Sequence, residues 1–231
     1  MTRPARWFIA IPADSLCAPI QTMLELTRLI QKIRVPVQFL LSTASNIPRA
    51  RNSILNDLRQ ADPDALWQWV LWVDNDIVIP WDGHHAIAAA IERAWNDHVG
   101  WTAHYPMANG ESVLMRARKP MENIHYSREE LPSLPDWTPI GMTGFGMLFL
   151  QQPTRYVFHA DVTGEDVHFW LEQPTLDIRY AKDIRIGHMK SITLDDRHDL
   201  RIVPAHHDWL ADPNASDSLV KSDLVQSEVN R

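Results

Sequence analysis

The stretch Leu71-Trp72-Val73-Asp74-Asn75-Asp76-Ile77-Val78 places two carboxylates, one residue apart, at the end of an apolar run. Such a run predicts a buried strand, and two neighbouring ionised carboxylates are costly to bury in a core. We therefore expect the strand to end at Asp74 and Asp76, with both side chains at the exposed carboxyl edge of a sheet. At such an edge, two carboxylates can share a divalent cation, and the cation can hold an anionic ligand.

Predicted strands and helices alternate along the first half of the chain. Short apolar runs predict strands, and apolar residues three or four apart predict helices. One helix opens at Ser45-Asn46-Ile47-Pro48, where asparagine is a favourable cap and proline fits the first turn, and it runs to about Gln60. Strands are expected at 7–11, ended by Pro12, and at 35–41, 69–73 and 99–104; the other helices are expected at 19–33 and 82–98. This order predicts an α/β fold with a Rossmann-like, doubly wound and mostly parallel sheet.

The second half of the chain is less regular. Residues 105–139 are rich in proline, and we expect a hairpin near 112–126. A further strand is predicted at 143–151, a helix at 164–172 and a late strand at 177–186. We expect one domain over residues 1–194 and an extension over 195–231, which becomes polar after Pro213 and is predicted to be partly disordered.

The composition indicates a globular protein that does not bind through a broad basic surface. The 231 residues are 45% hydrophobic and 22% charged, and the net charge is -7. That charge disfavours diffuse binding to nucleic acid or anionic lipid, although a local basic cluster can still bind a phosphate. The single cysteine, Cys17, excludes an internal disulfide and suits a reducing compartment, so we expect a cytoplasmic location. The N-terminal apolar run is too short to span a membrane, and no membrane segment is predicted.

Three side chains near the start of the second helix, two basic and one polar, are candidates for anion binding. Arg49, Arg51 and Asn52 follow Pro48 there, and a helix N-terminus offers free backbone N–H groups to a phosphate. The alternative is a solvated basic turn that forms surface ion pairs.

A glycine cluster, Gly141, Gly144 and Gly146, also leaves two interpretations open, since it suits either a close approach to a ligand or a kinked strand.

Two further segments carry groups for proton transfer or metal binding. Glu165 and Asp166 follow Gly164 at a predicted helix start, where acidic residues either complement the helix dipole or provide a general base. His188 follows the last predicted strand, and its imidazole is either a third metal ligand or one of many surface histidines among the 11 in the chain.

In this order, the segments resemble nucleotide-sugar-dependent glycosyltransferases of the GT-A fold, which carry an Asp-x-Asp metal site. The chain is similar to the family 2 type. Through Arg49-Ala50-Arg51-Asn52 and the stretch from Trp69 to Val78 it also resembles fungal mannan-polymerase mannosyltransferases and small viral or bacterial relatives. The resemblance covers most of the chain, from Trp7 to Lys190.

The resemblance implies a role for each candidate residue. Asp74, Asp76 and His188 would hold Mn²⁺ or Mg²⁺, which bridges the diphosphate of a nucleotide-sugar donor. Asp166 would be the catalytic base of an inverting enzyme, with Glu165 supporting it. The remaining donor-binding residues would be Pro12 and Ala13 at the base, and Arg49, Arg51 and Asn52 at the nucleotide or its phosphates. Asp74 and Asn75 would also bind the substrate, and Gly144 belongs to the segment 141–146 that would run beside the donor sugar and the acceptor. The acceptor would be a glycan, a lipid-linked sugar, a protein, a small molecule or a modified nucleic acid.

Other readings of the same residues remain. The fold and the metal site also suit a nucleotide-sugar-binding module without turnover. A nucleotidyltransferase shares the metal carboxylates but normally has a glycine-rich phosphate loop after the first strand, where this chain has Pro12-Ala13-Asp14-Ser15. Of the 10 tryptophans, Trp81, Trp101 and Trp137 could each stack on a sugar ring or serve only in packing.

Overall fold

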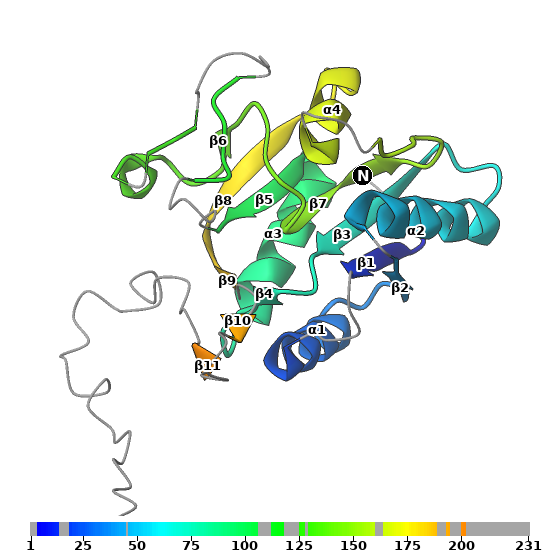
Figure 1. Cartoon of the computed structure of the whole chain (residues 1–231), viewed down its shortest axis with the longest axis horizontal. Helices are drawn as coiled ribbons and strands as arrows, with labels where there is room; N and C mark the ends of the chain where they lie inside the picture. The colour runs from blue at the N-terminus through cyan, green and yellow to red at the C-terminus, as the bar shows by residue number, and fades with distance from the viewer. Residues whose placement is uncertain are drawn as a thin grey trace, which may run out of the picture.

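The computed structural model describes residues 4–13, 19–44, 46–105, 112–117, 125–127, 129–159, 164–188, 193–194 and 200–201. Within this part of the chain, a seven-stranded sheet is covered by helices on both faces (Figure 1). The sheet strands are β1 (Trp7–Ala13), β2 (Val37–Thr43), β3 (Trp67–Val73), β5 (Gly100–His104), β6 (Thr138–Pro139), β7 (Met147–Pro153) and β8 (Ile178–Arg185). The helices are α1 (Ile20–Lys32), α2 (Ile47–Ala61), α3 (His84–Asp97), α4 (Glu165–Glu172) and a 3-10 turn at Leu131–Ser133. Short strands form separate pairs: β4 (Ile77–Val78) with β9 (Gly187–His188), and β10 (Thr193–Leu194) with β11 (Leu200–Arg201).

The strand order β2-β1-β3-β7-β5-β8-β6 confirms an α/β fold with a mostly parallel sheet. β1 runs parallel to both β2 and β3, and β5 runs parallel to β8. β7 lies antiparallel between β3 and β5, and β6 is antiparallel to β8. The reversed β7 has a direct consequence for function, because it begins at the same edge of the sheet at which β3 ends.

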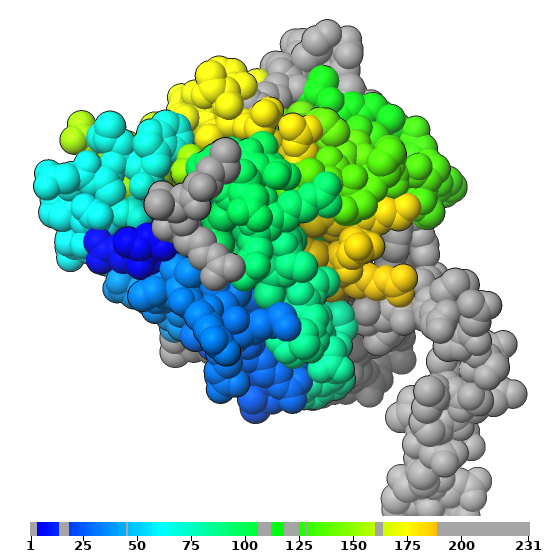
Figure 2. Space-filling model, turned by 180° about the vertical axis from the view of Figure 1, so that it is seen from behind, coloured from blue at the N-terminus to red at the C-terminus, as the bar shows by residue number. Residues whose placement is uncertain are grey.

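The helices lie in two layers. α1 and α3 lie next to each other on one face, as the view from behind shows, and α2 packs on β1 and β2 from the other (Figures 1 and 2). α2 begins where the sequence predicts, because the side chain of Asn46 accepts a hydrogen bond of 3.0 Å from the backbone N–H of Arg49. α3 starts two residues later than predicted, after a turn in which the N–H of Gly83 donates to Pro80.

Large aromatic side chains fill the core between these layers. Trp7, Trp72, Trp101 and Trp170 are fully buried, and the ring of Phe149 contacts several of the core tryptophans. Trp101 therefore serves in packing, and a sugar-stacking role for it is wrong. Trp81 is 58% exposed, and it lies under the guanidinium group of Arg28 at 5.4 Å. Trp137 lies in the same way under Arg93 at 4.3 Å.

Four strands differ from the predictions by two residues or more, and one of them, β3, starts two residues earlier than predicted. β1 continues through Pro12 to Ala13, because the backbone pairing with β2 persists beyond the proline, up to the bond from the N–H of Ala44 to Ala13. β2 starts and ends two residues later than predicted, and β7 starts only at Met147, after the glycine segment. Of the predicted hairpin at 112–126, the structure describes residues 112–117 and 125–126, where Met115 and His125 form an antiparallel bridge that agrees with a hairpin. The polar tail after Pro213 lies outside the described residues. No helix in the described ranges has the length and apolar character needed to cross a bilayer.

Candidate functional site

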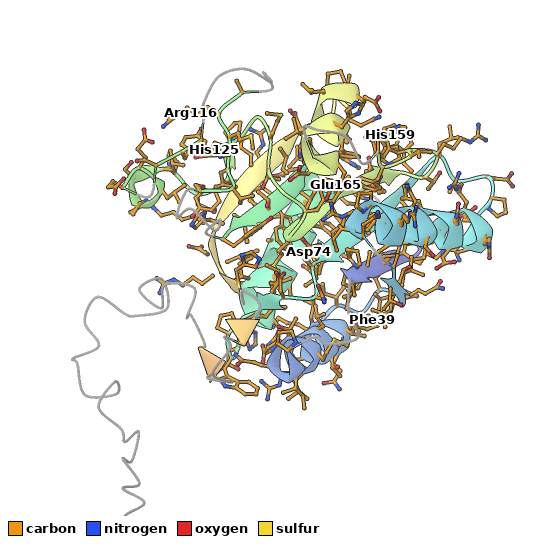
Figure 3. All side chains as sticks on the ribbon, viewed as in Figure 1. Phe39, Asp74, Arg116, His125, His159 and Glu165 are labelled. Atoms are coloured by element: carbon orange, nitrogen blue, oxygen red, sulfur yellow. The ribbon has the colours of Figure 1, made fainter. Side chains whose placement is uncertain are left out.

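The candidate residues meet at one edge of the sheet because of the strand directions. β1, β3, β5 and β8 all end at this edge, and β7 starts there. The register between Ala10 and Trp72 puts Pro12 level with Asp74, at the ends of neighbouring strands. The N–H of Asp74 donates to the carbonyl of Gly146 at 2.9 Å, which ties the acidic stretch to the glycine segment. In Figure 3, Asp74 and Glu165 lie close together near the centre of this edge.

Arg51 occupies the middle of the site. Its side chain is 3% exposed, and one guanidinium nitrogen lies 3.1 and 3.4 Å from the two carboxylate oxygens of Asp74. The other terminal nitrogen donates to the carboxylate of Glu165. The guanidinium also packs on the rings of Phe145 and Phe158, at 4.7 and 5.7 Å from their centroids. The alternative of a solvated turn with surface ion pairs is therefore wrong for Arg51, which is a buried cation held by two acids.

The charges around Arg51 perturb one another. Burial alone disfavours the charged guanidinium, but Asp74, Glu165 and Asp166 outweigh it and raise the pKa of Arg51. Burial raises the pKa of Asp74, against the attraction of Arg51, and the negative charge of Asp76 raises it further. Burial likewise raises the pKa of Asp166, and Glu165 adds to that effect. The excess of carboxylates favours the arrival of further positive charge, which a divalent cation provides.

Asp76 and His188 are brought together by the pairing of two short strands. Ile77, which follows Asp76, lies opposite His188 in the antiparallel pair of β4 and β9 (Figure 1). The imidazole Nε2 of His188 is 2.8 Å from Oδ2 of Asp76. This is the length of a hydrogen bond between the two side chains, and it also matches the separation of about 3 Å between neighbouring ligands of an octahedral ion with bonds of about 2.1 Å. A carboxylate oxygen with an imidazole nitrogen is a donor set that fits Mn²⁺ and, less closely, Mg²⁺.

Asp74 does not share the orientation of that pair, because its carboxylate faces Arg51. Across the described ranges, one group of three histidine and acidic side chains brings its ligand atoms within 4.8 Å, and that group is Asp82, His84 and His85. There, Nδ1 of His84 lies 2.8 Å from the buried carboxylate of Glu25, a contact that does not prevent Nε2 of the same ring from binding a metal. None of these three residues belongs to the metal site expected from the sequence. Asp76 and His188 are thus the two members of the expected metal site that stand together.

The glycine cluster makes room for Tyr105. A methyl group on Gly144 would lie 2.4 Å from the Tyr105 hydroxyl and 3.4 Å from Oδ2 of Asp166, and one on Gly146 would lie 2.4 Å from the tyrosine ring. Asp166 therefore faces the glycine segment. Its other oxygen accepts a bond of 2.8 Å from the N–H of Val167 at the start of α4. The group that approaches Gly144 and Gly146 closely in this structure is therefore a tyrosine of the chain itself, whereas Gly141 lies against the backbone of Ala117.

The other predicted donor-binding residues have different surroundings. Asn52 uses both ends of its amide on the backbone of Phe158, donating at 2.8 Å to the carbonyl and accepting at 2.7 Å from the N–H. Arg49 has an exposed side chain on the first turn of α2, and Asn75 is half-buried between the two aspartates. Pro12 and Ala13 are buried at the end of β1. The structure thus assigns Asn52 a supporting contact that the sequence did not predict.

Tyr105 and the two phenylalanines around Arg51 were not singled out from the sequence. Tyr105 is buried, its hydroxyl accepts a bond of 2.9 Å from the N–H of Gly146, and its ring lies 5.4 Å from that of His188. Burial and the nearby Asp74 raise the pKa of Tyr105. One signal could have found it: Tyr105 directly follows a predicted strand, as Asp74 does.

Comparison with models of protein families and with curated proteins finds no match. Among solved structures, the chain is similar to GalNAc-T7 with UDP, GalNAc and Mn²⁺, at 9% identity and a TM-score of 0.41, over 80% of this chain and 43% of that one. It is also similar to a glycosyltransferase involved in the glycosylation of the major capsid of PBCV-1, at 12% identity and a TM-score of 0.44, over 81% and 96%. A third similar structure is 4-diphosphocytidyl-2C-methyl-D-erythritol synthase, at 12% identity and a TM-score of 0.44, over 90% and 98%. We derive the function from the side chains of the site.

Proposed function

We propose that the chain is a metal-dependent glycosyltransferase that moves a sugar from a nucleotide-diphosphate sugar to an acceptor hydroxyl. The observation that carries the proposal is the pairing of Asp76 with His188 at 2.8 Å, next to a buried Arg51 held between Asp74 and Glu165. A protein of net charge -7 needs a local source of positive charge to bind a polyanionic donor. At this edge of the sheet a bound cation would provide that charge, because the charge of Arg51 is already balanced by Asp74 and Glu165.

The donor half of the site would be built on β1, α2 and the acidic stretch. Asp76 and His188 would hold Mn²⁺ or Mg²⁺, with Asp74 as a further ligand if its carboxylate turns from Arg51. When bound, such an ion stabilises the negative charge that develops on a nucleoside diphosphate leaving group. Arg49, exposed on the first turn of α2, is placed to contact a phosphate, and Pro12 and Ala13 would line the base pocket.

Asp166 is the proposed catalytic base. Its carboxylate would take the proton of the acceptor hydroxyl while the acceptor oxygen bonds to the anomeric carbon and the bond from that carbon to the diphosphate oxygen breaks. A pKa raised by burial makes Asp166 a stronger base than an ordinary aspartate. Glu165 is held by Arg51, so its charge stays beside Asp166 and supports the same shift.

The test is binding and turnover with a panel of nucleotide sugars, with and without Mn²⁺. We expect metal-dependent thermal stabilisation by one donor, and product that is lost in Asp76→Asn and in Asp166→Asn. Asp62→Asn is the matched control, because Asp62, like Asp76, pairs with a basic side chain, Arg6 at 3.1 Å, but at the opposite edge of the sheet.

Three outcomes separate the alternatives. Donor binding with product that depends on Asp166 supports a glycosyltransferase. Donor binding that gives no product identifies a binding module of the same fold. Absence of any metal-dependent binding in folded protein overturns the proposal. Asp14 and Ser15, on which the comparison with nucleotidyltransferases depends, lie outside the described residues.

A further inference from the structure

α1 turns polar side chains toward the segment that follows Asp76. Thr22 and Glu25 lie one turn apart on the buried face of the helix, with exposed fractions of 3% and 1%. Gln21 lies beside them and is partly exposed. A buried polar group is costly unless it is hydrogen-bonded, so the partners of these side chains indicate what the helix face does.

Thr22 uses its hydroxyl twice on one short stretch of backbone. Oγ1 donates to the carbonyl of Ile77 at 2.7 Å and accepts from the N–H of Ile79 at 3.1 Å. In an extended segment these two groups point to the same side, where a neighbouring strand would otherwise bond them. The side chain of Thr22 therefore acts as a strand partner for β4. Gln21 adds a bond of 2.9 Å to the carbonyl of Ile79.

Glu25 fixes the far end of the same segment. Its carboxylate lies 3.3 Å from the backbone N–H of His84 and 2.8 Å from Nδ1 of that residue, at the first turn of α3. α3 has no capping side chain of its own, so Glu25 supplies the acidic group that a helix N-terminus favours. Residues 77–84 are thus bonded to α1 at both ends.

The cation pair depends on this segment. Asp76 immediately precedes Ile77, and Ile77 lies opposite His188 in the strand pair. The acidic stretch is already closed by a turn in which the N–H of Ile77 donates to the carbonyl of Asp74 at 3.1 Å. The hydroxyl of Thr22 donates to the carbonyl of Ile77 and so holds the other side of this turn. A ligand pair that is fixed before binding holds a cation more tightly than one that must first be ordered.

We propose that Thr22 is a positioning residue for the cation site: through β4 it holds Asp76 beside His188. The proposal rests on the proposed role of Asp76 and His188 as cation ligands. Thr22 touches neither ligand, and its effect passes through the backbone of Ile77.

The experiment measures Mn²⁺ affinity, by calorimetric titration of the full chain without nucleotide, together with urea unfolding. Thr22→Val keeps the shape and removes both hydrogen bonds, and Thr22→Ser keeps the hydroxyl. Thr154→Val is the matched control, because Thr154 is 1% exposed and its hydroxyl donates to the carbonyl of Ala65 at 2.7 Å. It lies beside the start of β3, about 20 Å from Asp74 along that strand.

We expect Thr22→Val to weaken Mn²⁺ binding about tenfold, the lower end of what outer contacts of metal sites contribute. Thr22→Ser should restore most of the affinity, and Thr154→Val should lose stability while its Mn²⁺ affinity stays that of the wild type. Equal Mn²⁺ affinity in wild type and folded Thr22→Val overturns the proposal, whatever happens to stability.

Two further results keep the test decisive. If Thr22→Val does not fold, Gln21→Ala replaces it, because Gln21 is partly exposed and bonds the same segment at the carbonyl of Ile79. A weaker Mn²⁺ affinity of Gln21→Ala than of the wild type supports the proposal, and an unchanged affinity overturns it. If the wild type binds no Mn²⁺ at all, the proposed function itself fails, which is a different result from a wild type and a Thr22→Val that bind equally.

Discussion

Replacing Arg51 by methionine tests the charge balance of the site. Methionine keeps much of the length and the contact with Phe145 and Phe158, but it removes the charge between Asp74 and Glu165. Removing one partner of a buried ion pair typically costs about 3–5 kcal/mol, because a charge is left buried without compensation. The side chains of Asp74 and Glu165 are 24% and 22% exposed, so water relieves part of that cost. We expect Arg51→Met to lower the free energy of unfolding by about 3 kcal/mol at neutral pH.

The loss should shrink as the pH falls. In the wild type, Arg51 opposes the rise that burial causes in the pKa of Asp74, and without Arg51 that pKa rises further above its ordinary value of 3.8. A carboxyl group with a raised pKa in the native state destabilises the fold at pH values above that pKa. The penalty begins to fall once the pH is below the raised pKa, because the native group takes up a proton there, and it is gone below the ordinary value, where both states are protonated. The difference between wild type and Arg51→Met should therefore be smaller at pH 5 than at pH 7.5.

Urea unfolding followed by tryptophan fluorescence measures both effects. Arg93→Met is the control, because Arg93 also pairs with a carboxylate, Asp136 at 2.6 Å, and lies over an aromatic ring, but its side chain is 46% exposed. Such a surface pair contributes about 0–1 kcal/mol. If Arg51→Met costs no more than Arg93→Met, or if its cost does not depend on pH, the account of Arg51 as the buried counter-charge of the site is wrong.

Three further predictions follow from single contacts. Asn52→Ala should lower the free energy of unfolding by about 1–3 kcal/mol, because the backbone N–H and carbonyl of Phe158 lose their hydrogen-bond partner. A loss of nucleotide-sugar affinity without any loss of stability would instead favour a direct contact of Asn52 with the nucleotide. Gly144→Ala should lower the free energy of unfolding by about 1–3 kcal/mol, because the added methyl group overpacks against the hydroxyl of Tyr105. The loss should be smaller in a Tyr105→Phe background, and identical losses in the two backgrounds would refute the contact. The acidic limb of the kcat/KM profile should lie at higher pH than an ordinary aspartate gives, because the pKa of Asp166 is raised. Glu165→Gln should move this limb to lower pH, since the charge of Glu165 contributes to the raised pKa. A limb that does not move would show that Glu165 does not raise the pKa of the catalytic base.

The sequence was sufficient to predict the edge of the sheet where the site lies. Because ionised carboxylates are costly to bury, β3 was expected to end before Asp74, and it ends at Val73. The asparagine cap located the start of α2 in the same direct way. The reversed direction of β7 was not predictable, because it depends on pairing between Val73 and Met147, far apart in the chain, and not on a local pattern.

The burial of Arg51 could have been predicted from helical periodicity. Arg51 precedes Ile54, Leu55 and Leu58 by three, four and seven residues, so it lies on the apolar stripe of its helix, whereas Arg49 lies off it. The same spacing places Thr22 and Glu25 on the stripe with Leu26 and Leu29 in α1.

Polar residues inside an apolar stripe are therefore a readable signal of a buried network in this chain. Their partners, in contrast, come from distant segments. The carboxylate of Glu165 contacts Arg51 from 114 positions further along the chain, and no spacing within the sequence encodes that contact.

The most direct test of the account is a calorimetric titration of the protein with uridine and guanosine diphosphate, with and without Mn²⁺. We predict that one diphosphate binds the wild type and Asp62→Asn only when Mn²⁺ is present, and that Asp76→Asn binds neither under any condition. Diphosphate binding that does not depend on Mn²⁺, or that is unchanged in Asp76→Asn, would contradict a cation site formed by Asp76 and His188.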